Sequence, residues 1–258
     1  MKIEIKIQDQ MKREVILPAF PLRIVSLVPS QTELLYYLEL ENEVVGITKF
    51  CIHPNEWFRT KERVGGTKSL DIEKIRELKP DLIIGNKEEN EQKDIEVLTD
   101  IAPVWMSDIY DLNDALAMIN AIGEITNKSI EVNKLVSLIE NRFELLNSIK
   151  KNKTVLYFIW QEPMMLAGKN TFIDAMLQEC GLENLARNER YPQAIGDENP
   201  DFVFLSSEPF PFGEKHILEF QQLYPKAKIV LVDGEFFSWY GSRLKDAPAY
   251  FNQLLAEL

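Results

Sequence analysis

Short apolar runs that alternate with helix-forming segments constrain the fold of this chain more than any other feature of its sequence. Residues 23–28 (RIVSLV) form one such run, which Pro29 ends, and residues 82–85 (LIIG) form another directly after the helical pattern LDIEKIRELKP. Apolar runs of this length are typical of strands that are buried on both faces of a parallel sheet. Strands that alternate with helices in this way predict an α/β fold.

The first turn of this pattern predicts a defined helix start. Ser30 and Glu33 have the spacing of a capping box, in which the serine hydroxyl accepts from the backbone at Glu33 and the Glu33 carboxylate reaches back. We therefore expect a capped helix over TELLYYLEL, followed by a strand that ends near Thr48.

The amino-terminal residues predict a β-hairpin rather than a leader. Ile3, Ile5 and Ile7 alternate with charged residues, and REVILP is the expected partner strand across Asp9-Gln10. A secretory leader needs an unbroken apolar core of about 7–15 residues, and a membrane-spanning helix needs a run of about 18 or more. Neither pattern occurs, so we expect no membrane span and no export signal in this sequence.

The same alternation of strands and helices returns after Lys153, whereas residues 111–150 contain no proline and no strand pattern. Apolar spacing there predicts one long helix over Ser129–Ile149, roughly 30 Å in length. We therefore predict an α/β lobe with a leading β-hairpin (1–110), a helical connector (111–150) and a second α/β lobe (151–258). Two such lobes predict a ligand cleft between strand ends; one larger α/β domain that contains a long helix is the alternative.

The charge of the chain excludes several partners. Its formal net charge is −12, from 41 acidic and 29 basic residues, and the acidic residues are spread along the sequence. Such a balance argues against a nucleic acid or an anionic membrane held by basic patches.

Cysteine and histidine are too few for most intrinsic metal sites. Cys51 and Cys180 lie far apart with no CxxC spacing, and His53 and His216 stand in unrelated settings. A zinc or iron–sulfur site built from these residues is therefore not expected. His216 lies within a helical pattern and is expected to have a surface or structural role, whereas His53 is either a turn residue or a ligand contact.

Aromatic and methionine side chains follow several of the predicted strands. They suit the wall of a site for a large flat ligand, although the cluster after the strand KIVLVD can equally be core. Arg243 follows that cluster and is expected to pair with a ligand carboxylate or phosphate, or with Asp233 or Glu235. The residues of these loops are Trp160, Met164, Met165, Tyr191, Glu235, Phe236, Phe237, Trp239 and Tyr240.

The segments RIVSLVPSQTELLYYLEL, VVGITKF, VGGTKSLDIEKIRELKPDLIIG and AGKNTFIDAMLQECGLENL resemble the substrate-binding proteins of ABC transporters for vitamin B12 and ferric siderophores. The resemblance covers roughly Leu22 to Phe251. It implies two Rossmann-like lobes joined by one rigid helix, and a monomer without catalytic residues or an intrinsic cofactor. The implied ligand is a metal chelate (ferric siderophore, cobalamin or related corrinoid, or haem), delivered to an ABC permease with its ATPase.

The resemblance also implies roles for individual positions. By position, the ligand contacts carry over to Phe50, to the Trp160–Met165 loop, to Tyr191 and to the Glu235–Arg243 loop. Glu73 matches a surface glutamate that docks to the permease, and Glu208 and Glu214 are candidates for a second one. The chain departs from the cobalamin-binding members at Thr67, where they have a tryptophan, and at Met165, where they have an aromatic residue.

Members of the family work outside the cytoplasmic membrane, so the resemblance implies a periplasmic location, with the cytoplasm as the alternative for a sequence without a leader. Two other functions remain open. One is a cytosolic tetrapyrrole-processing or metal-processing enzyme or chelatase of the same two-lobed fold, in which His53, Asp233 or Glu235 acts on the bound molecule. The other is a receptor for a free metal ion.

Overall fold

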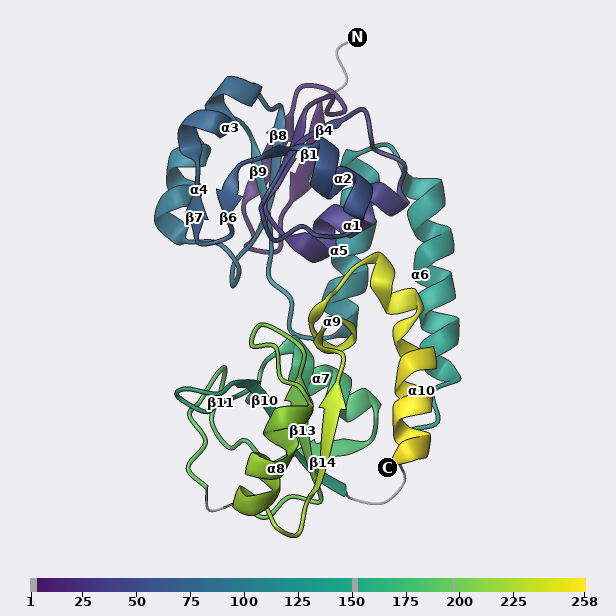
Figure 1. Cartoon of the computed structure of the whole chain (residues 1–258). Helices are drawn as coiled ribbons and strands as arrows, with labels where there is room; N and C mark the ends of the chain where they lie inside the picture. Colours follow the sequence, from purple (N-terminus) through teal and green to yellow (C-terminus); the bar gives the residue numbers. More distant parts are fainter. Residues whose placement is uncertain (1–3, 150–152, 197) are drawn as a thin grey trace. The chain divides into compact units, whose positions relative to one another are not determined.

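The computed structural model describes residues 4–149, 153–196 and 198–258, and the chain divides into two compact units (Figure 1). Unit 1 consists of Met1–Ile109, Asn113–Leu138 and Tyr240–Arg243, and unit 2 consists of Tyr110–Leu112, Ile139–Trp239 and Leu244–Leu258. Each unit contains its own mostly parallel sheet. The predicted α/β class is therefore confirmed, while the predicted connector at 111–150 and the predicted cleft stay predictions.

Unit 1 is built on a five-stranded parallel sheet. Its strand order is β5 (Glu62–Arg63), β4 (Val44–Ile47), β3 (Ile24–Ser26), β8 (Leu82–Asn86) and β9 (Val104–Ser107). The chain moves outward from β3 in both directions, and right-handed crossovers then require helices on both faces of the sheet. Figure 1 shows α1 (Pro29–Tyr37) and α2 (Asn55–Thr60) on one face and α3 (Ile72–Leu78) and α4 (Gln92–Leu98) on the other.

The predicted amino-terminal hairpin is confirmed from Ile5 onward, and Ile3 lies outside the described residues. Strand β1 (Ile5–Gln8) pairs with β2 (Glu14–Leu17) in antiparallel register. The turn is longer than Asp9-Gln10 because the fully buried Asp9 carboxylate accepts from the backbone N–H of Arg13 at 2.8 Å and from the Arg13 Nε at 2.8 Å. A smaller hairpin joins β6 (Gly65–Gly66) to β7 (Ser69–Leu70).

The predicted capping box at α1 is wrong. The helix begins at Pro29 with Val28 as its N-cap, and no side chain caps it. Proline needs no N–H partner in the first turn, so the helix starts one residue earlier than the box requires. Ser30 is consequently buried inside the helix, and the Glu33 carboxylate faces Arg243 instead of the helix start.

Residues 111–149 form two helices, α5 (Leu112–Ile125) and α6 (Ser129–Glu144). The predicted helix over Ser129–Ile149 therefore ends five residues early. The reason is tertiary, because the amide of Asn147 donates to the Asn252 side chain at 2.8 Å and the amide of Ile149 donates to the Cys180 carbonyl at 2.9 Å. Within the described ranges, no helix is both long enough and apolar enough to cross a membrane.

Unit 2 contains a second five-stranded sheet of order β11 (Met165–Leu166), β10 (Lys153–Trp160), β13 (Phe202–Ser206) and β14 (Lys228–Val232), with β12 (Leu182–Asn184) also paired to β10. Strands β10, β12, β13 and β14 are parallel, and β11 is antiparallel to β10. The helices of unit 2 are α7 (Phe172–Glu179), α8 (Glu214–Leu223), α9 (Gly234–Ser238) and α10 (Ala247–Glu257). A 3-10 turn at Ser242–Lys245 begins in unit 1 and ends in unit 2.

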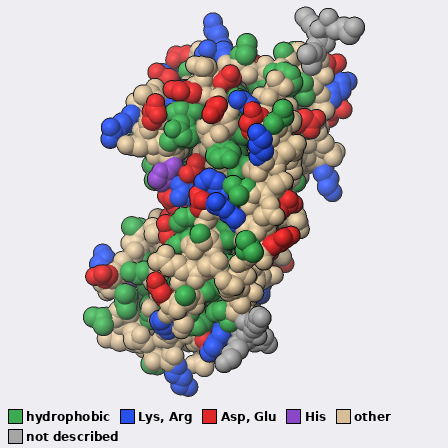
Figure 2. Space-filling model, turned by 90° about the vertical axis from the view of Figure 1, so that its right-hand side faces the viewer, with side chains coloured by type: hydrophobic (Ala, Val, Ile, Leu, Met, Phe, Trp, Pro, Cys, Tyr) green, Lys and Arg blue, Asp and Glu red, His purple; other side chains and the backbone are tan. Residues whose placement is uncertain are grey.

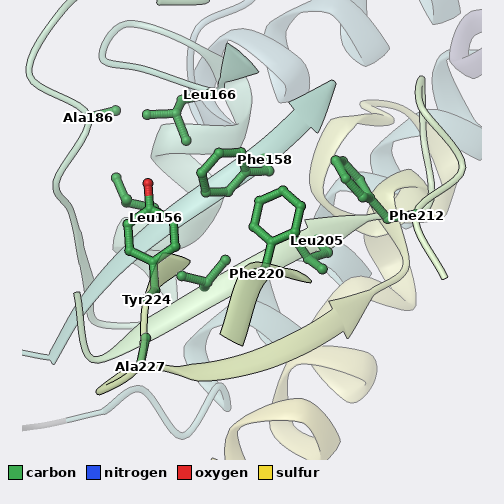
Figure 3. Close-up of a cluster of buried hydrophobic side chains, with 10 residues drawn as sticks. Leu156, Phe158, Leu166, Ala186, Leu205, Phe212, Phe220, Tyr224 and Ala227 are labelled. Carbon is green, nitrogen blue, oxygen red and sulfur yellow. The ribbon is translucent and has the colours of Figure 1, made fainter. Parts of the chain in front are cut away.

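Aromatic rings fill the core between α8 and the sheet of unit 2 (Figure 3). Phe158 of β10 meets Phe220 of α8 edge to face, with ring centroids 4.8 Å apart, and Tyr224 lies beside the same ring. Edge-to-face pairs of this kind add about 0.5–1.5 kcal/mol beyond the burial of their area. Cys180 is buried in the same unit, as its helical spacing predicts, and both cysteines are free thiols.

A close approach of α5 to α6 generates the first prediction. A Cβ at Gly123 would lie 2.3 Å from Cγ2 of Val132, whose β-branched side chain has little rotamer freedom. We expect Gly123→Ala to lower the free energy of unfolding by about 1–3 kcal/mol through overpacking. In a Val132→Ala background the same change should cost less, because both Cγ atoms are gone and only the Cβ of residue 132, at 3.0 Å, remains close. Denaturant titrations of the four proteins measure this difference, and equal effects in both backgrounds would contradict it.

Candidate functional site

The candidate residues lie at the carboxyl ends of parallel strands. In each sheet those ends share one edge, and ligands of open α/β sheets bind there, at the point where the strand order changes direction. In unit 1 the direction changes between β3 and β8, and in unit 2 it changes between β10 and β13.

A buried network of polar side chains lies in unit 1 at the point where the strand order changes direction. The Gln31 amide donates to Ser107 Oγ at 2.6 Å, and the Asn86 amide donates to the same oxygen at 2.9 Å. Asn90 accepts from the backbone N–H of Asn86 at 2.9 Å and donates to the Thr67 carbonyl at 3.0 Å. Nothing in the sequence patterns marked these residues, since their bonds join separate strands and loops. Hydrogen-bonded side chains therefore fill this part of the sheet edge, which is not an open crevice.

The loop after β4 carries an exposed aromatic residue at the carboxyl edge of unit 1. Phe50 is 51% exposed and Ile52 is 45% exposed, which is unusual for such large apolar side chains. Between them Cys51 is fully buried, with its thiol within 3.1 Å of Thr32 Oγ1 and 3.2 Å of Thr48 Oγ1, and burial raises the pKa of that thiol. Cys51 is thus an anchor that leaves Phe50 facing outward, and His53 follows half-buried.

The β6–β7 hairpin supports the Phe50 loop. The backbone N–H of Lys49 donates to the Gly65 carbonyl at 2.8 Å. A Cβ at Gly66 would lie only 3.2 Å from Cε2 of Phe50, so glycine permits this close approach. Thr67 is 8% exposed. The hairpin therefore supports an exposed Phe50, whereas Thr67 in the same hairpin contributes little exposed surface.

Two aromatic residues meet at the corresponding point of unit 2. Trp160 ends β10, is 39% exposed, and donates from its indole Nε1 to the Glu162 carbonyl at 2.9 Å. Phe210, in the loop after β13, lies edge to face with Trp160 at 5.6 Å between centroids, and its backbone N–H donates to Ile159. Phe210 is not among the ligand contacts expected from the sequence. Its signal was the pair of phenylalanines in EPFPF directly after a buried strand.

The other residues predicted for this loop lie beside that pair or behind it. Met164 packs against the core cluster that includes Phe158, and Met165 pairs with β10 through β11. Tyr191 is half-buried in the loop that pairs with β11 through the Met165–Gln193 bridge.

The aromatic run at α9 divides between core and edge. Phe237 is fully buried, and its ring centroid lies 5.2 Å from that of Tyr157 and 4.7 Å from that of Phe251. It is therefore a core residue and not part of the proposed ligand wall. Phe236 stacks on Tyr250 at 4.6 Å with nearly parallel rings. Trp239 and Tyr240 are 6% and 7% exposed, respectively, and Glu235 is half-buried. The alternative prediction, that the aromatic cluster after β14 belongs to the core, therefore applies to Phe237 in particular.

Glu208 holds the end of α9 in place. One of its carboxylate oxygens, Oε1, accepts from Ser238 Oγ at 2.5 Å and from the Trp239 indole at 2.9 Å. Burial raises the pKa of this carboxyl above the ordinary glutamic acid value of 4.5, and the charges of Glu235 and Asp233 act in the same direction. Glu208 is thus a positioning residue for the aromatic loop, turned inward from the surface that a docking residue needs.

Arg243 is committed to a partner within unit 1. Its Nε and Nη2 donate to the two carboxylate oxygens of Glu33 at 3.1 and 2.8 Å, and both side chains are largely buried. A bidentate pair of this kind has more defined geometry than an exposed ion pair. Glu33 was not among the partners expected for Arg243 from the sequence, which were a ligand group, Asp233 or Glu235.

The other two glutamates predicted for docking are exposed. Glu73 lies in the first turn of α3, with its side chain 81% exposed and Arg76 at 3.8 Å, and Glu214 lies in the first turn of α8. Acidic residues are stabilised near a helix amino terminus, so each position is also favourable for the helix itself. Figure 2 shows acidic and basic side chains interspersed over the face that it presents.

His216, the metal-binding residue types and a surface hollow do not contribute to the candidate ligand site. His216 is buried, and its Nδ1 accepts from the backbone N–H of Gly213 at 2.9 Å at the start of α8, which confirms the structural role predicted for it. Among the described residues no group of histidine, cysteine and acidic side chains is arranged to hold a metal ion. A shallow hollow lined by Arg13–Ile16 and Thr99–Val104 lies at the amino end of β9, away from the candidate residues.

Comparisons with known proteins place this geometry in context. Residues 24–211 match the family model described as periplasmic binding protein. An uncharacterized ABC transporter substrate-binding lipoprotein, YvrC of Bacillus subtilis (strain 168), is 28% identical over 215 residues, which cover 77% of this chain and 68% of the relative.

Solved structures share the fold over nearly the whole chain. The periplasmic vitamin B12 binding protein BtuF of Vibrio cholerae has a TM-score of 0.78 at 20% identity, over 92% of this chain and 98% of that one. The periplasmic heme-binding protein BhuT, in complex with two hemes, has a TM-score of 0.79 at 19% identity, over 91% and 98%. The siderophore binding protein BauB, bound to acinetobactin and ferric iron, has a TM-score of 0.78 at 15% identity, over 98% and 99%.

The raised pKa of Glu208 generates the second prediction. A carboxyl whose pKa is raised on folding binds more protons in the folded state, so its contribution to stability falls as pH rises above 4.5. Glu208→Gln keeps an oxygen acceptor for Ser238 and Trp239 without the buried charge. We expect this variant to gain stability over the wild type as pH rises from about 4.5 to about 8. Denaturant titrations across that range measure the gain, with Glu214→Gln as the exposed control, and a difference that stays constant with pH would contradict it.

Proposed function

This chain belongs to the periplasmic binding protein family, and we propose that it captures a metal chelate and delivers it to the permease of an ABC importer. The observation that carries this proposal is the exposed aromatic residue at the carboxyl edge of each sheet, Phe50 in unit 1 and Trp160 in unit 2, the latter in contact with the half-buried Phe210. Large flat or irregular ligands bind to such surfaces, because aromatic rings bury much area with little loss of side-chain freedom.

The relatives support the class of ligand. The solved structures of the same fold bear the names of vitamin B12, heme and siderophore binding proteins, and each of these ligands is a metal chelate. We therefore propose cobalamin or a related corrinoid, haem, or a ferric siderophore. The metal would arrive inside the chelate, and the protein would act without a cofactor of its own.

The relatives also support the partner and the place of action. The name of the B. subtilis relative includes both ABC transporter and lipoprotein. We propose that this protein works outside the cytoplasmic membrane, as a monomer, with a permease and its ATPase. These names describe solute-binding proteins, and a processing enzyme or chelatase gains no support from the described residues.

Trp160 provides a test of ligand capture. Of the four tryptophans, Trp57 and Trp105 are fully buried and Trp239 is 6% exposed, so Trp160 is the one that a ligand at the unit 2 edge reaches first. We expect cyanocobalamin, haemin or a ferric siderophore to quench the protein's fluorescence saturably. Trp160→Phe should raise the Kd obtained from that titration, because Trp160 contacts the ligand, and Trp57→Phe should leave the Kd unchanged. A free tryptophan derivative titrated alongside corrects for light absorbed by the ligand, and no saturable response to any of the three would overturn the proposed function.

Glu73 and Glu214 provide a test of docking. Both are exposed and lie on helices of different units, whereas Glu208 is turned inward. We expect Glu73→Gln and Glu214→Gln each to weaken binding to the cognate permease–ATPase complex several-fold, with ligand affinity unchanged, because a rim charge steers association. Glu131→Gln, at an exposed position on α6, is the matched control. Surface plasmon resonance measures the affinities, and wild-type docking by both variants would remove these glutamates from the interface.

A further inference from the structure

A lysine beside the exposed aromatic ring of unit 1 has no acidic partner within the described residues. Lys49 follows β4 by two positions and is exposed. Its ammonium lies 5.1 Å from the centroid of the Phe50 ring, and this cation–π contact is the side-chain interaction of Lys49 within the described residues.

The hairpin under Lys49 holds its side chain in place. The Lys49 backbone N–H is bonded to the Gly65 carbonyl, and a Cβ at Gly66 would lie 3.1 Å from Cε of the lysine. The aliphatic part of Lys49 thus rests on the hairpin while its ammonium stays in solvent, as long basic side chains commonly do. A cation placed over one side of a ring keeps its N–H donors for another group.

Two other basic groups of unit 1 are engaged in ion pairs. Lys87, after β8, pairs with Asp108 at 2.6 Å, and Arg243 pairs with Glu33 at 2.8 Å. Lys68, in the β6–β7 turn, is exposed, like Lys49. The edge of unit 1 therefore offers an apolar ring and an available cation side by side.

We propose that Lys49 binds an anionic oxygen group of the captured chelate while the apolar part of that chelate lies on Phe50. The group is a carboxylate, a catecholate or a phosphate, since each accepts charge-assisted hydrogen bonds from an ammonium. This inference rests on the proposed function and deepens it, because it selects chelates that carry an anionic oxygen group over chelates without one.

Pairs of chelates that differ in the anionic group test the inference. The pairs are haemin with its dimethyl ester, cyanocobalamin with dicyanocobinamide, and a ferric tris-catecholate with a neutral ferric hydroxamate. The proteins are the wild type, Lys49→Gln, Lys49→Arg and the control Lys134→Gln, which removes one charge from an exposed position on α6 of the same unit. Calorimetry or fluorescence gives each Kd, and circular dichroism confirms that each variant is folded.

We expect Lys49→Gln to weaken binding of the anionic member by about tenfold, the size typical of a charge-assisted bond. It should change binding of the neutral member by less than about twofold, and the loss should shrink as ionic strength rises from about 0.02 to about 0.5 M. Lys49→Arg should retain wild-type affinity, and Lys134→Gln should have no effect.

Equal effects of Lys49→Gln on both members of a pair, or no effect while the wild type binds, would overturn the role of Lys49 and leave the proposed function intact. Failure of the wild type to bind any member of the three pairs would overturn the proposed function and this inference with it.

Discussion

The parallel direction of the strands is the constraint on which the rest of this structure depends. Neighbouring parallel strands bring their carboxyl ends to one edge, so loops that are distant in the sequence meet there. Trp160 and Phe210 follow different strands and nevertheless lie 5.6 Å apart. The buried network of Gln31, Asn86 and Ser107 forms in the same way at the other sheet. Because the strands are buried on both faces, their apolar sequences leave chemistry to the residues just beyond them.

The Glu33–Arg243 pair shows how one long-range contact decides the roles of several residues. The two side chains are 210 positions apart in sequence and form a bidentate pair within unit 1. The segment Tyr240–Arg243 belongs to unit 1 although the residues on either side of it belong to unit 2. With Glu33 engaged, α1 has no capping box, and Arg243 is paired within the protein, while the cation beside Phe50 is Lys49. A charged side chain without a nearby partner in the sequence can therefore bind a ligand only if no distant residue pairs with it in the folded protein.

Burial likewise separates glutamates that the sequence treats alike. Glu208 and Glu214 lie six residues apart in one loop and helix, yet Glu208 accepts from Ser238 and Trp239 while Glu214 is exposed. The first fixes the position of the α9 aromatic loop, and the second is suited to meet a partner. Their different environments follow from the packing of α9 against the end of β13, which no local pattern records.

The sequence by itself determined the α/β class, the amino-terminal hairpin, most strands and helices, and the resemblance to substrate-binding proteins. These features follow from the spacing of apolar residues, which reports burial over a few positions. Only the tertiary structure decided that α6 ends at Glu144, that Phe237 is core, that Phe210 stands beside Trp160, and that Lys49 is the cation at Phe50. The physical reason is that hydrogen bonds, ion pairs and ring contacts between distant segments depend on strand order, and spacing along the chain does not encode which distant group arrives as the partner.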